Sequence, residues 1–135
     1  MFQKRVKFNG KFSNVAKYNE VKSERPGGLS FASKLEASLY DYLKACEDRG
    51  EIKIEEIQSS VKLTKAQIRC LPDFRIYDNE LKCQVWCEAK GFETERWLLI
   101  KRLWKFYGPG PIRIYKGTHK NLYLDEVIIP NVGED

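Results

Sequence analysis

The stretch LPDFRIYDNELKCQVWCEAKG, residues 71–91, is an apolar run with charged residues near both of its ends. Its apolar and β-branched residues predict strands at 67–78 and 80–91, and the polar DNE between them predicts an antiparallel hairpin. Burying an unpaired charge is costly. Asp73, Glu88 and Lys90 therefore need a physical reason to stand beside a buried strand.

Glu88 and Lys90 are two residues apart, so on a strand their side chains project to the same side. The residues just before them are apolar on both faces of the strand, which is typical of a central strand. Asp73 lies on the partner strand of the hairpin. Counting back from the expected turn pairs Asp73 with a residue nearer 85 than 88, so the two carboxylates can meet only if the hairpin contains a bulge or splays.

Two carboxylates that meet repel each other unless a cation lies between them. A hard divalent ion such as Mg²⁺ prefers oxygen ligands, and a nearby lysine can serve an attacking water or stabilise charge on a phosphoryl group. This combination suits phosphodiester hydrolysis. An ordinary salt bridge of Glu88 with Lys90 or Arg75 at the rim of the sheet is the alternative.

The rest of the chain predicts an α/β domain with a mixed sheet and helices packed against it. Helices are expected at 33–50 and 93–108, and further strands at 52–58, 112–117 and 123–130. The second helix has an apolar face predicted to be core, formed by Trp97, Ile100, Trp104 and Tyr107. A different face is basic, and is either solvated or in contact with phosphates; it carries Lys101, Arg102 and Lys105.

The Pro-Asp-Phe of residues 72–74, the fourteen residues between Asp73 and Glu88, the EAKG ending and the basic helix that follows resemble the PD-(D/E)XK nuclease superfamily. The resemblance covers residues 30–117 and implies a restriction-endonuclease-like core with a central mixed sheet flanked by helices. The stretch FASKLEASLYDYL is similar to small phage and transposon-type endonucleases, which implies that Glu36 reaches a metal site. A helix capping box formed by Ser33 and Glu36 is the competing interpretation.

The resemblance also implies which residues act. Asp73 and Glu88 would hold Mg²⁺ or Mn²⁺, with Glu36 and the backbone carbonyl of Ala89 as further ligands. Lys90 would serve the water or the transition state. Gln58 resembles a glutamine found near this position in some relatives, and a purely structural role for it is equally open.

The implied activity is that of a metal-dependent DNA endonuclease directed to DNA shape or branches, similar to phage Holliday-junction resolvases. Two alternatives remain open: a catalytically silent DNA-binding protein of the same fold, and a nuclease subunit of a larger transposase or restriction-type complex. A homodimer is expected, because cutting two strands needs two sites.

The charge of +5 lies entirely in the first thirty residues, where seven basic residues face two acids. Residues 1–29 are therefore interpreted as a basic arm and 30–135 as one domain, with a turn-rich break at 24–30. The arm either contacts DNA phosphates or is a solubilising tail. Its proposed contacts are Lys4, Arg5, Lys7, Lys11 and Lys17.

Neither a signal peptide nor a membrane-length apolar stretch is visible, so a cytoplasmic protein of a bacterium or a phage-infected host cell is expected. The four cysteines are expected to be reduced core residues. The single histidine, His119, is expected in a solvated loop.

Overall fold

The computed structural model describes residues 23–131, so the basic residues predicted to contact DNA at positions 4–17 lie outside the described part. It contains two helices, α1 (Lys34–Asp48) and α2 (Glu95–Tyr107). The strands are β1 (Ser23–Arg25), β2 (Leu29–Phe31), β3 (Ile52–Ile57), β4 (Val61–Lys62), β5 (Arg69–Cys70), β6 (Phe74–Asp78), β7 (Cys83–Ala89), β8 (Ile112–Thr118) and β9 (Asn121–Ile128).

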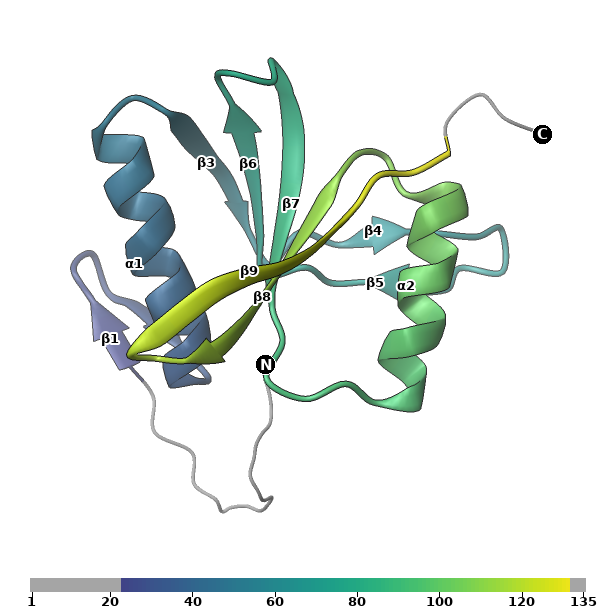
Figure 1. Cartoon of the computed structure of the whole chain (residues 1–135), viewed down its shortest axis with the longest axis horizontal. Coiled ribbons are helices and arrows are strands. Elements are labelled where there is room, and N and C mark those ends of the chain that lie inside the picture. The colour runs from purple at the N-terminus through teal and green to yellow at the C-terminus, as the bar shows by residue number, and fades with distance from the viewer. Residues whose placement is uncertain (1–22, 132–135) are drawn as a thin grey trace.

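Five strands form the central sheet in the order β3-β6-β7-β8-β9 (Figure 1). Only the β7–β8 pair is parallel, because the connection between these strands passes through α2; the other neighbours are antiparallel. The predicted mixed sheet is therefore confirmed.

The two helices pack on opposite faces of this sheet. Val85 and Cys87 of β7 point into the core that contains α1, whereas Trp86 between them points into the core that contains α2. This arrangement explains why the three consecutive residues 85–87 of β7 are apolar on both faces of the strand. It also confirms that helices flank the sheet. Neither described helix is long and apolar enough to cross a membrane.

The predicted strand at 67–78 is wrong in one respect, because the chain leaves it at Leu71–Asp73. Arg69–Cys70 instead pairs with Val61–Lys62 in a separate small hairpin, and the central strand begins at Phe74. Pro72 has no N–H to donate to a sheet ladder. Its carbonyl and that of Asp73 accept hydrogen bonds from the N–H groups of Ser59 and Gln58, which hold this crossing in place.

Two other boundaries differ from expectation. Residues 24–30, predicted to be a break, form the β1–β2 hairpin, which packs against α1 and is tied to it by the Arg25–Asp41 ion pair at 2.7 Å. Tyr107, predicted to lie in the core, is 58% exposed, although Trp97, Ile100 and Trp104 are buried. The helix outlasts the core at this end, because the chain turns back after Gly108 and the carbonyl of Gly110 accepts a hydrogen bond from Trp104 Nε1.

The cysteines and the histidine lie where the sequence predicts. All four thiols are free; three are buried and Cys83 is partly buried. His119 is exposed in the turn between β8 and β9.

Candidate active site

The β6–β7 hairpin places Asp73 opposite Glu88 without a bulge. Its register runs uninterrupted from Asp78 opposite Cys83 to Phe74 opposite Cys87, so the next facing positions are 73 and 88. The expected bulge was wrong because the turn occupies residues 79–82 and not the DNE tripeptide at 78–80. That shift moves the register by the three residues that separated 85 from 88.

The two acidic residues are tied together through backbone groups. The N–H of Asp73 donates to Glu88 Oε1 at 3.1 Å, and the N–H of Ala89 donates to Asp73 Oδ2 at 2.8 Å. Both side chains project to the face of the sheet that carries Trp86, because each is one residue beyond a pair that faces α1. The hairpin end therefore holds two carboxylates side by side.

Glu36 and Gln58 reach the same place from other elements. Glu36 lies in the first turn of α1, and its Oε2 accepts a hydrogen bond from Gln58 Nε2 at 3.5 Å. The Ser33 hydroxyl caps α1 by accepting from the N–H of Glu36 at 3.0 Å, so the cap and the contact with Gln58 coexist. Gln58 has φ +60°, a conformation that costs energy for a residue other than glycine. Its N–H donates to the carbonyl of Asp73 at 2.7 Å, which holds it there.

The three carboxylates lie close together and are almost inaccessible to solvent. Glu36, Asp73 and Glu88 are only 2%, 3% and 6% exposed. Burial raises the pKa of Asp73 well above its ordinary value, and the charges of Glu88 and Glu36 raise it further. Burial also raises the pKa of Glu88, although the Lys90 ammonium opposes the shift. Negative charge at this end of the sheet therefore exceeds what the neighbouring cation compensates.

Lys90 lies beside the carboxylates and above an indole ring. Its Nζ is 3.4 Å from Glu88 Oε2 and 4.5 Å from the centre of the Trp97 ring. The alternative salt bridge to Arg75 is not formed, because that guanidinium pairs with Glu55 and Glu56. The salt bridge to Lys90 is present, and it coexists with the convergence of the acids.

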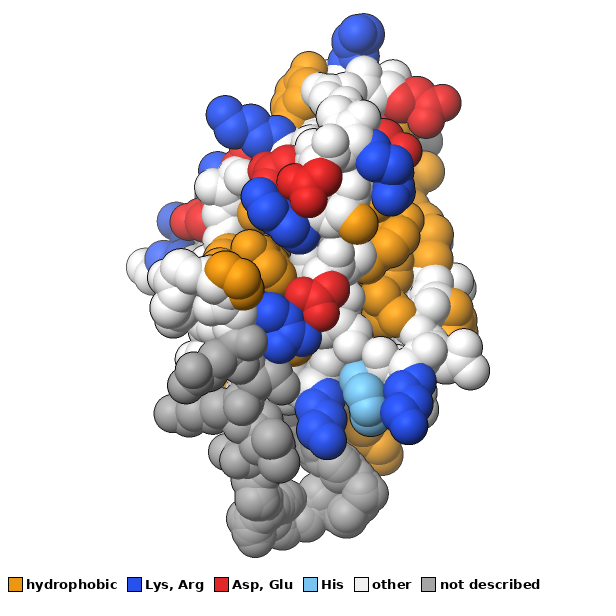
Figure 2. Space-filling model, turned by 90° about the vertical axis from the view of Figure 1, so that its left-hand side faces the viewer, with side chains coloured by type: hydrophobic (Ala, Val, Ile, Leu, Met, Phe, Trp, Pro, Cys, Tyr) orange, Lys and Arg blue, Asp and Glu red, His pale blue; other side chains and the backbone are white. Residues whose placement is uncertain are grey.

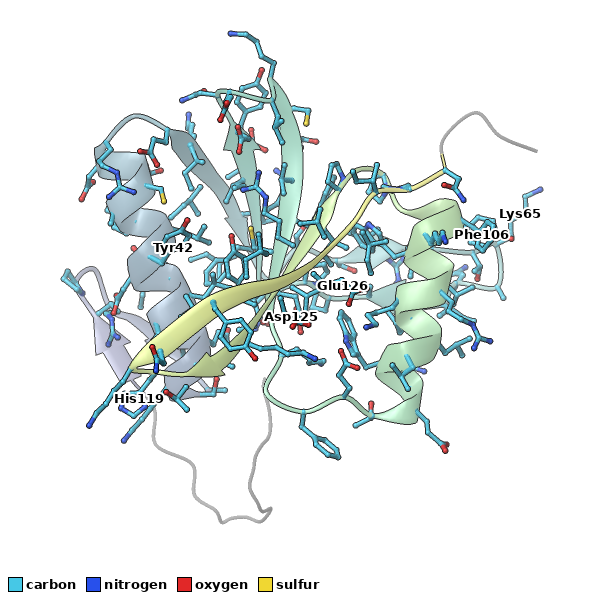
Figure 3. The ribbon with its side chains drawn as sticks, in the orientation of Figure 1. Tyr42, Lys65, Phe106, His119, Asp125 and Glu126 are labelled. Carbon is cyan, nitrogen blue, oxygen red and sulfur yellow. The ribbon has the colours of Figure 1, made fainter. Side chains whose placement is uncertain are left out.

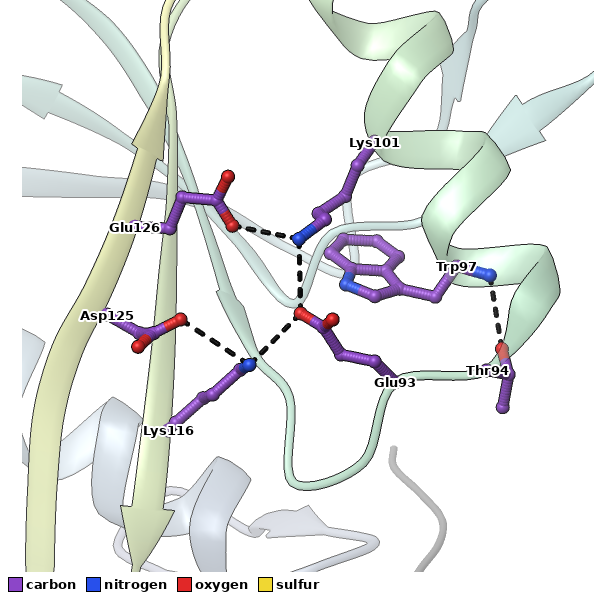
Figure 4. Close-up of polar contacts among 7 residues, drawn as sticks. All are labelled: Glu93, Thr94, Trp97, Lys101, Lys116, Asp125 and Glu126. Carbon is purple, nitrogen blue, oxygen red and sulfur yellow. Dashed lines mark hydrogen bonds and ion pairs between the residues drawn. The ribbon is translucent and has the colours of Figure 1, made fainter.

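A network of five charged side chains borders the site (Figure 4). Glu93 Oε2 lies 3.1 Å from Lys101 Nζ and 3.0 Å from Lys116 Nζ, which ties the loop after Lys90 to both α2 and β8. Lys101 also pairs with Glu126 at 2.8 Å, and Lys116 with Asp125 at 3.4 Å, both on β9. The loop that follows the site is thus anchored on two sides.

This network changes the interpretation of the basic helix face. The sequence predicts that Lys101 is either solvated or in contact with phosphates, but its ammonium forms ion pairs with the carboxylates of Glu93 and Glu126. Arg102 and Lys105 are exposed, and no ion pair of either is found within residues 23–131. They share the outer face of α2 with exposed Leu98, Leu99 and Phe106.

Sequence reasoning missed the contact between Trp97 and Lys90. The helical spacing correctly predicts Trp97 as core, but its face also supports the lysine. Trp97 Nε1 is buried, and within residues 23–131 no hydrogen-bond partner of it is found. The acids and lysines of the network gave no local signal, since they come from four elements: the loop after Lys90, α2, β8 and β9.

The fit to a divalent metal rests on the donor set. No three His, Cys, Asp or Glu side chains in the described part already converge as a formed metal centre. Asp73 and Glu88 each direct one oxygen to a backbone N–H, while buried carboxylates in excess of the nearby positive charge are the donors that Mg²⁺ prefers. The chemistry of these groups therefore fits a hard cation.

Comparison with protein-family models, curated proteins and solved structures finds no match to this chain.

Proposed function

We propose that the protein is a metal-dependent DNA endonuclease of the PD-(D/E)XK kind, with a restriction-endonuclease-like core. One observation carries the proposal: Asp73 and Glu88 face each other, buried, at one end of the β6–β7 hairpin, with the Lys90 ammonium alongside. Burying a charged cluster of this composition lowers the stability of the fold, so its presence points to a function. The order α1, β3, β6, β7, α2, β8 also supports the proposal, because the resemblance implies a helix, a three-stranded meander, a second helix and a further strand.

Asp73 and Glu88 would hold Mg²⁺ or Mn²⁺, with Glu36 and the Ala89 carbonyl as further ligands. When bound, the ion supplies charge neutralisation and Lewis acidity toward a phosphodiester. Gln58 would keep Glu36 in place through its side-chain amide. The raised pKa values of Asp73 and Glu88 mean that protons compete with the cation for these oxygens.

Lys90 would act directly on the substrate. Its ammonium carries three N–H donors. The contacts with Glu88 and the Trp97 ring do not use all of them, so a donor is available to the substrate. It can hold a water near the scissile phosphate or donate to a phosphate oxygen whose charge increases during attack. The carboxylate of Glu88 and the aromatic face of Trp97 hold the ammonium in a fixed orientation.

The proposed substrate is DNA recognised by shape or branching, and the proposed assembly is a homodimer in which each copy cuts one strand. The test is incubation of the full chain with supercoiled plasmid or a synthetic four-way junction, with Mg²⁺ or with EDTA. We expect cleavage that requires Mg²⁺ and is lost in E88Q and in K90M. A dimer would cut the junction in two strands and resolve it into two duplexes, whereas a monomer would only nick one strand.

E80Q and K82Q are the matched controls. Glu80 and Lys82 are exposed in the turn at the other end of the same hairpin, so these changes remove the same kinds of charge far from the site. Both controls should cut like the unchanged protein. Binding of the junction without any metal-dependent cutting would reject the nuclease and support the silent DNA-binding protein. Cutting by E88Q at the unchanged rate would reject the site.

A further inference from the structure

A small basic surface lies beside the candidate site, formed by Lys34, His119 and Lys120. Lys34 is the first residue of α1, and His119 and Lys120 form the turn between β8 and β9. All three side chains are exposed. Figure 2 shows the histidine between two basic side chains at one end of the molecule, and Figure 3 places His119 at the tip of the β8–β9 hairpin, beside α1.

The hairpin tip is fixed against α1. The hydroxyl of Ser38 donates to the carbonyl of His119 at 2.9 Å. Ser38 is four residues after Lys34, so the two lie on the same side of the helix, one turn apart. Gly117 has φ +107°, and a Cβ there would clash with the carbonyl of Asn121, so the chain reverses at a defined point. Lys34 and the turn residues are therefore held together by built contacts.

Among the residues that the structure describes, none forms an ion pair that compensates the positive charges in this surface. No ion pair of Lys34 or Lys120 is formed with any residue of the described segment, in contrast to Lys101 and Lys116 on the other side of the site. Lys34 also stands in the first turn of a helix, where the helix dipole disfavours a cation. Burial lowers the pKa of His119, and the nearby Lys34 and Lys120 lower it further, which agrees with their proximity. An anion at this surface would relieve the repulsion.

The first turn of α1 links this surface to the site. Lys34 is two residues before Glu36, and Glu36 lies close enough to Asp73 and Glu88 for its charge to raise the pKa of both carboxyls. Glu36 points inward to Gln58, while Lys34 is exposed. By contrast, Figure 3 shows Phe106, at the end of α2 that carries Lys105, on the opposite side of the molecule from His119. The end of α2 that carries Lys105 is therefore separate from this surface.

We propose that Lys34 and Lys120, with His119 between them, bind the phosphate backbone of the DNA strand on one side of the cleaved bond. This inference rests on the proposed function. Phosphate contacts fix the position and orientation of a duplex without reading its bases, which suits an enzyme directed to DNA shape. A strand held at this surface would pass the first turn of α1 and reach Asp73, Glu88 and Lys90.

The test measures binding separately from cleavage. The full chain carrying E88Q binds a fluorescently labelled four-way junction in EDTA, and anisotropy gives the affinity at several salt concentrations. Adding K34Q and K120Q should lower the affinity at least about tenfold at moderate salt. The slope of log affinity against log salt should fall by about 2, or about 1 for each lost phosphate contact.

The control pair is K53Q with K82Q. Both lysines are exposed near the turn end of the β6–β7 hairpin, since Lys53 pairs with Tyr77 and Lys82 lies in the turn. The same loss of net charge there should leave the salt slope unchanged. Equal effects of the two pairs, or no change of slope with K34Q and K120Q, would overturn the inference. Because metal and cutting play no part in this assay, its result is independent of whether the unchanged protein cleaves DNA.

Discussion

Asp73 immediately precedes β6 and Asp78 is the last residue of that strand; both are buried, yet their surroundings are opposite. Asp78 Oδ1 accepts from the N–H groups of Glu80 and Leu81 at 2.9 and 2.8 Å, and its Oδ2 accepts from Arg113 at 2.9 Å. Burial alone would raise the pKa of Asp78, but these hydrogen bonds outweigh it and lower the pKa. At the other end, burial and two carboxylates raise the pKa of Asp73.

The difference separates a structural carboxylate from one held ready for chemistry. The carboxylate of Asp78 has its hydrogen-bond and ion-pair partners within the chain. It accepts hydrogen bonds from the β6–β7 turn and pairs with Arg113, which joins the turn to β8. The Asp73 end has one hydrogen bond from Ala89 and repulsion from Glu88 and Glu36. Perturbed carboxylates of this second kind concentrate at functional sites.

The largest expected effect is on cleavage. D73N should lower the rate of Mg²⁺-dependent junction cutting by at least about 10³-fold, because it removes a carboxylate that would hold the metal, and the metal would neutralise the charge that develops on the phosphate. D78N should cut at nearly the unchanged rate per folded molecule, since its site stabilises the far turn. Single-turnover gel assays at matched concentrations of folded protein measure both. Similar loss in the two variants would abolish the distinction between the two ends.

Stability should respond in the opposite order. D78A removes the buried ion-pair partner of Arg113 and the acceptor of two backbone hydrogen bonds in the turn. It should lower the free energy of unfolding by about 2 kcal/mol. The expected loss is modest because Arg113 is partly exposed. D73N should be neutral or stabilising in EDTA at pH 8, because it relieves buried charge repulsion. Urea denaturation measures both. D48A is the control, since Asp48 is exposed and lies 3.8 Å from its partner, Lys44. A clear loss of stability in D73N would mean that Asp73 is structural after all.

The pH dependence sharpens the same contrast. The native pKa values of Asp73 and Glu88 are raised, so between the ordinary carboxyl range near 4 and those raised values the native state binds more protons than the unfolded state. Their contribution to stability is therefore present at low pH and is lost as the pH rises through the native values. Asp78, with a lowered pKa, contributes above its unfolded value and loses that contribution only in stronger acid.

The measurement is urea denaturation in EDTA across the range from acid to mildly alkaline pH. The combined D73N and E88Q variant should show a smaller fall of stability with rising pH than the unchanged chain. Excess Mg²⁺ at alkaline pH should raise the stability of the unchanged chain but not of this variant, because only a site that binds the ion gains from mass action. Parallel pH profiles for the two proteins would contradict the crowding of these carboxylates.

Much of the fold could be predicted from local patterns. Alternation and helical spacing indicate both helices and the five strands of the central sheet, because each element buries a periodic face. The error at Leu71–Asp73 has a physical cause: the apolar residues Cys70 and Leu71 continue the strand pattern, while the break depends on carbonyls that bond Gln58 and Ser59 from another segment. Such a partner cannot be read from the local sequence.

The site was predictable in composition but not in geometry. Asp73, Glu88, Lys90, Glu36 and Gln58 come together as expected, whereas the register that joins the first two depends on where the turn lies. A register changes with a shift of one residue, and turn residues alone do not determine it here. The pairing of Lys101 with Glu93 and Glu126 depends on tertiary contacts, so its helix face gave a misleading prediction of availability.

The smallest expected effect concerns the support of Lys90 by Trp97. W97F keeps an aromatic face but a weaker one, and a cation above an aromatic ring contributes about 1 kcal/mol, so the cutting rate should fall only about two- to fivefold. No hydrogen bond within residues 23–131 is lost, since Trp97 Nε1 has no partner there. W104F is the matched control: it alters the same core and loses the bond to the Gly110 carbonyl, so it should destabilise the fold more and change the rate per folded molecule less. The comparison of rates per folded molecule decides the role of Trp97: a larger loss in W97F than in W104F supports the contact with Lys90, whereas equal losses in the two variants would leave Trp97 a purely structural role.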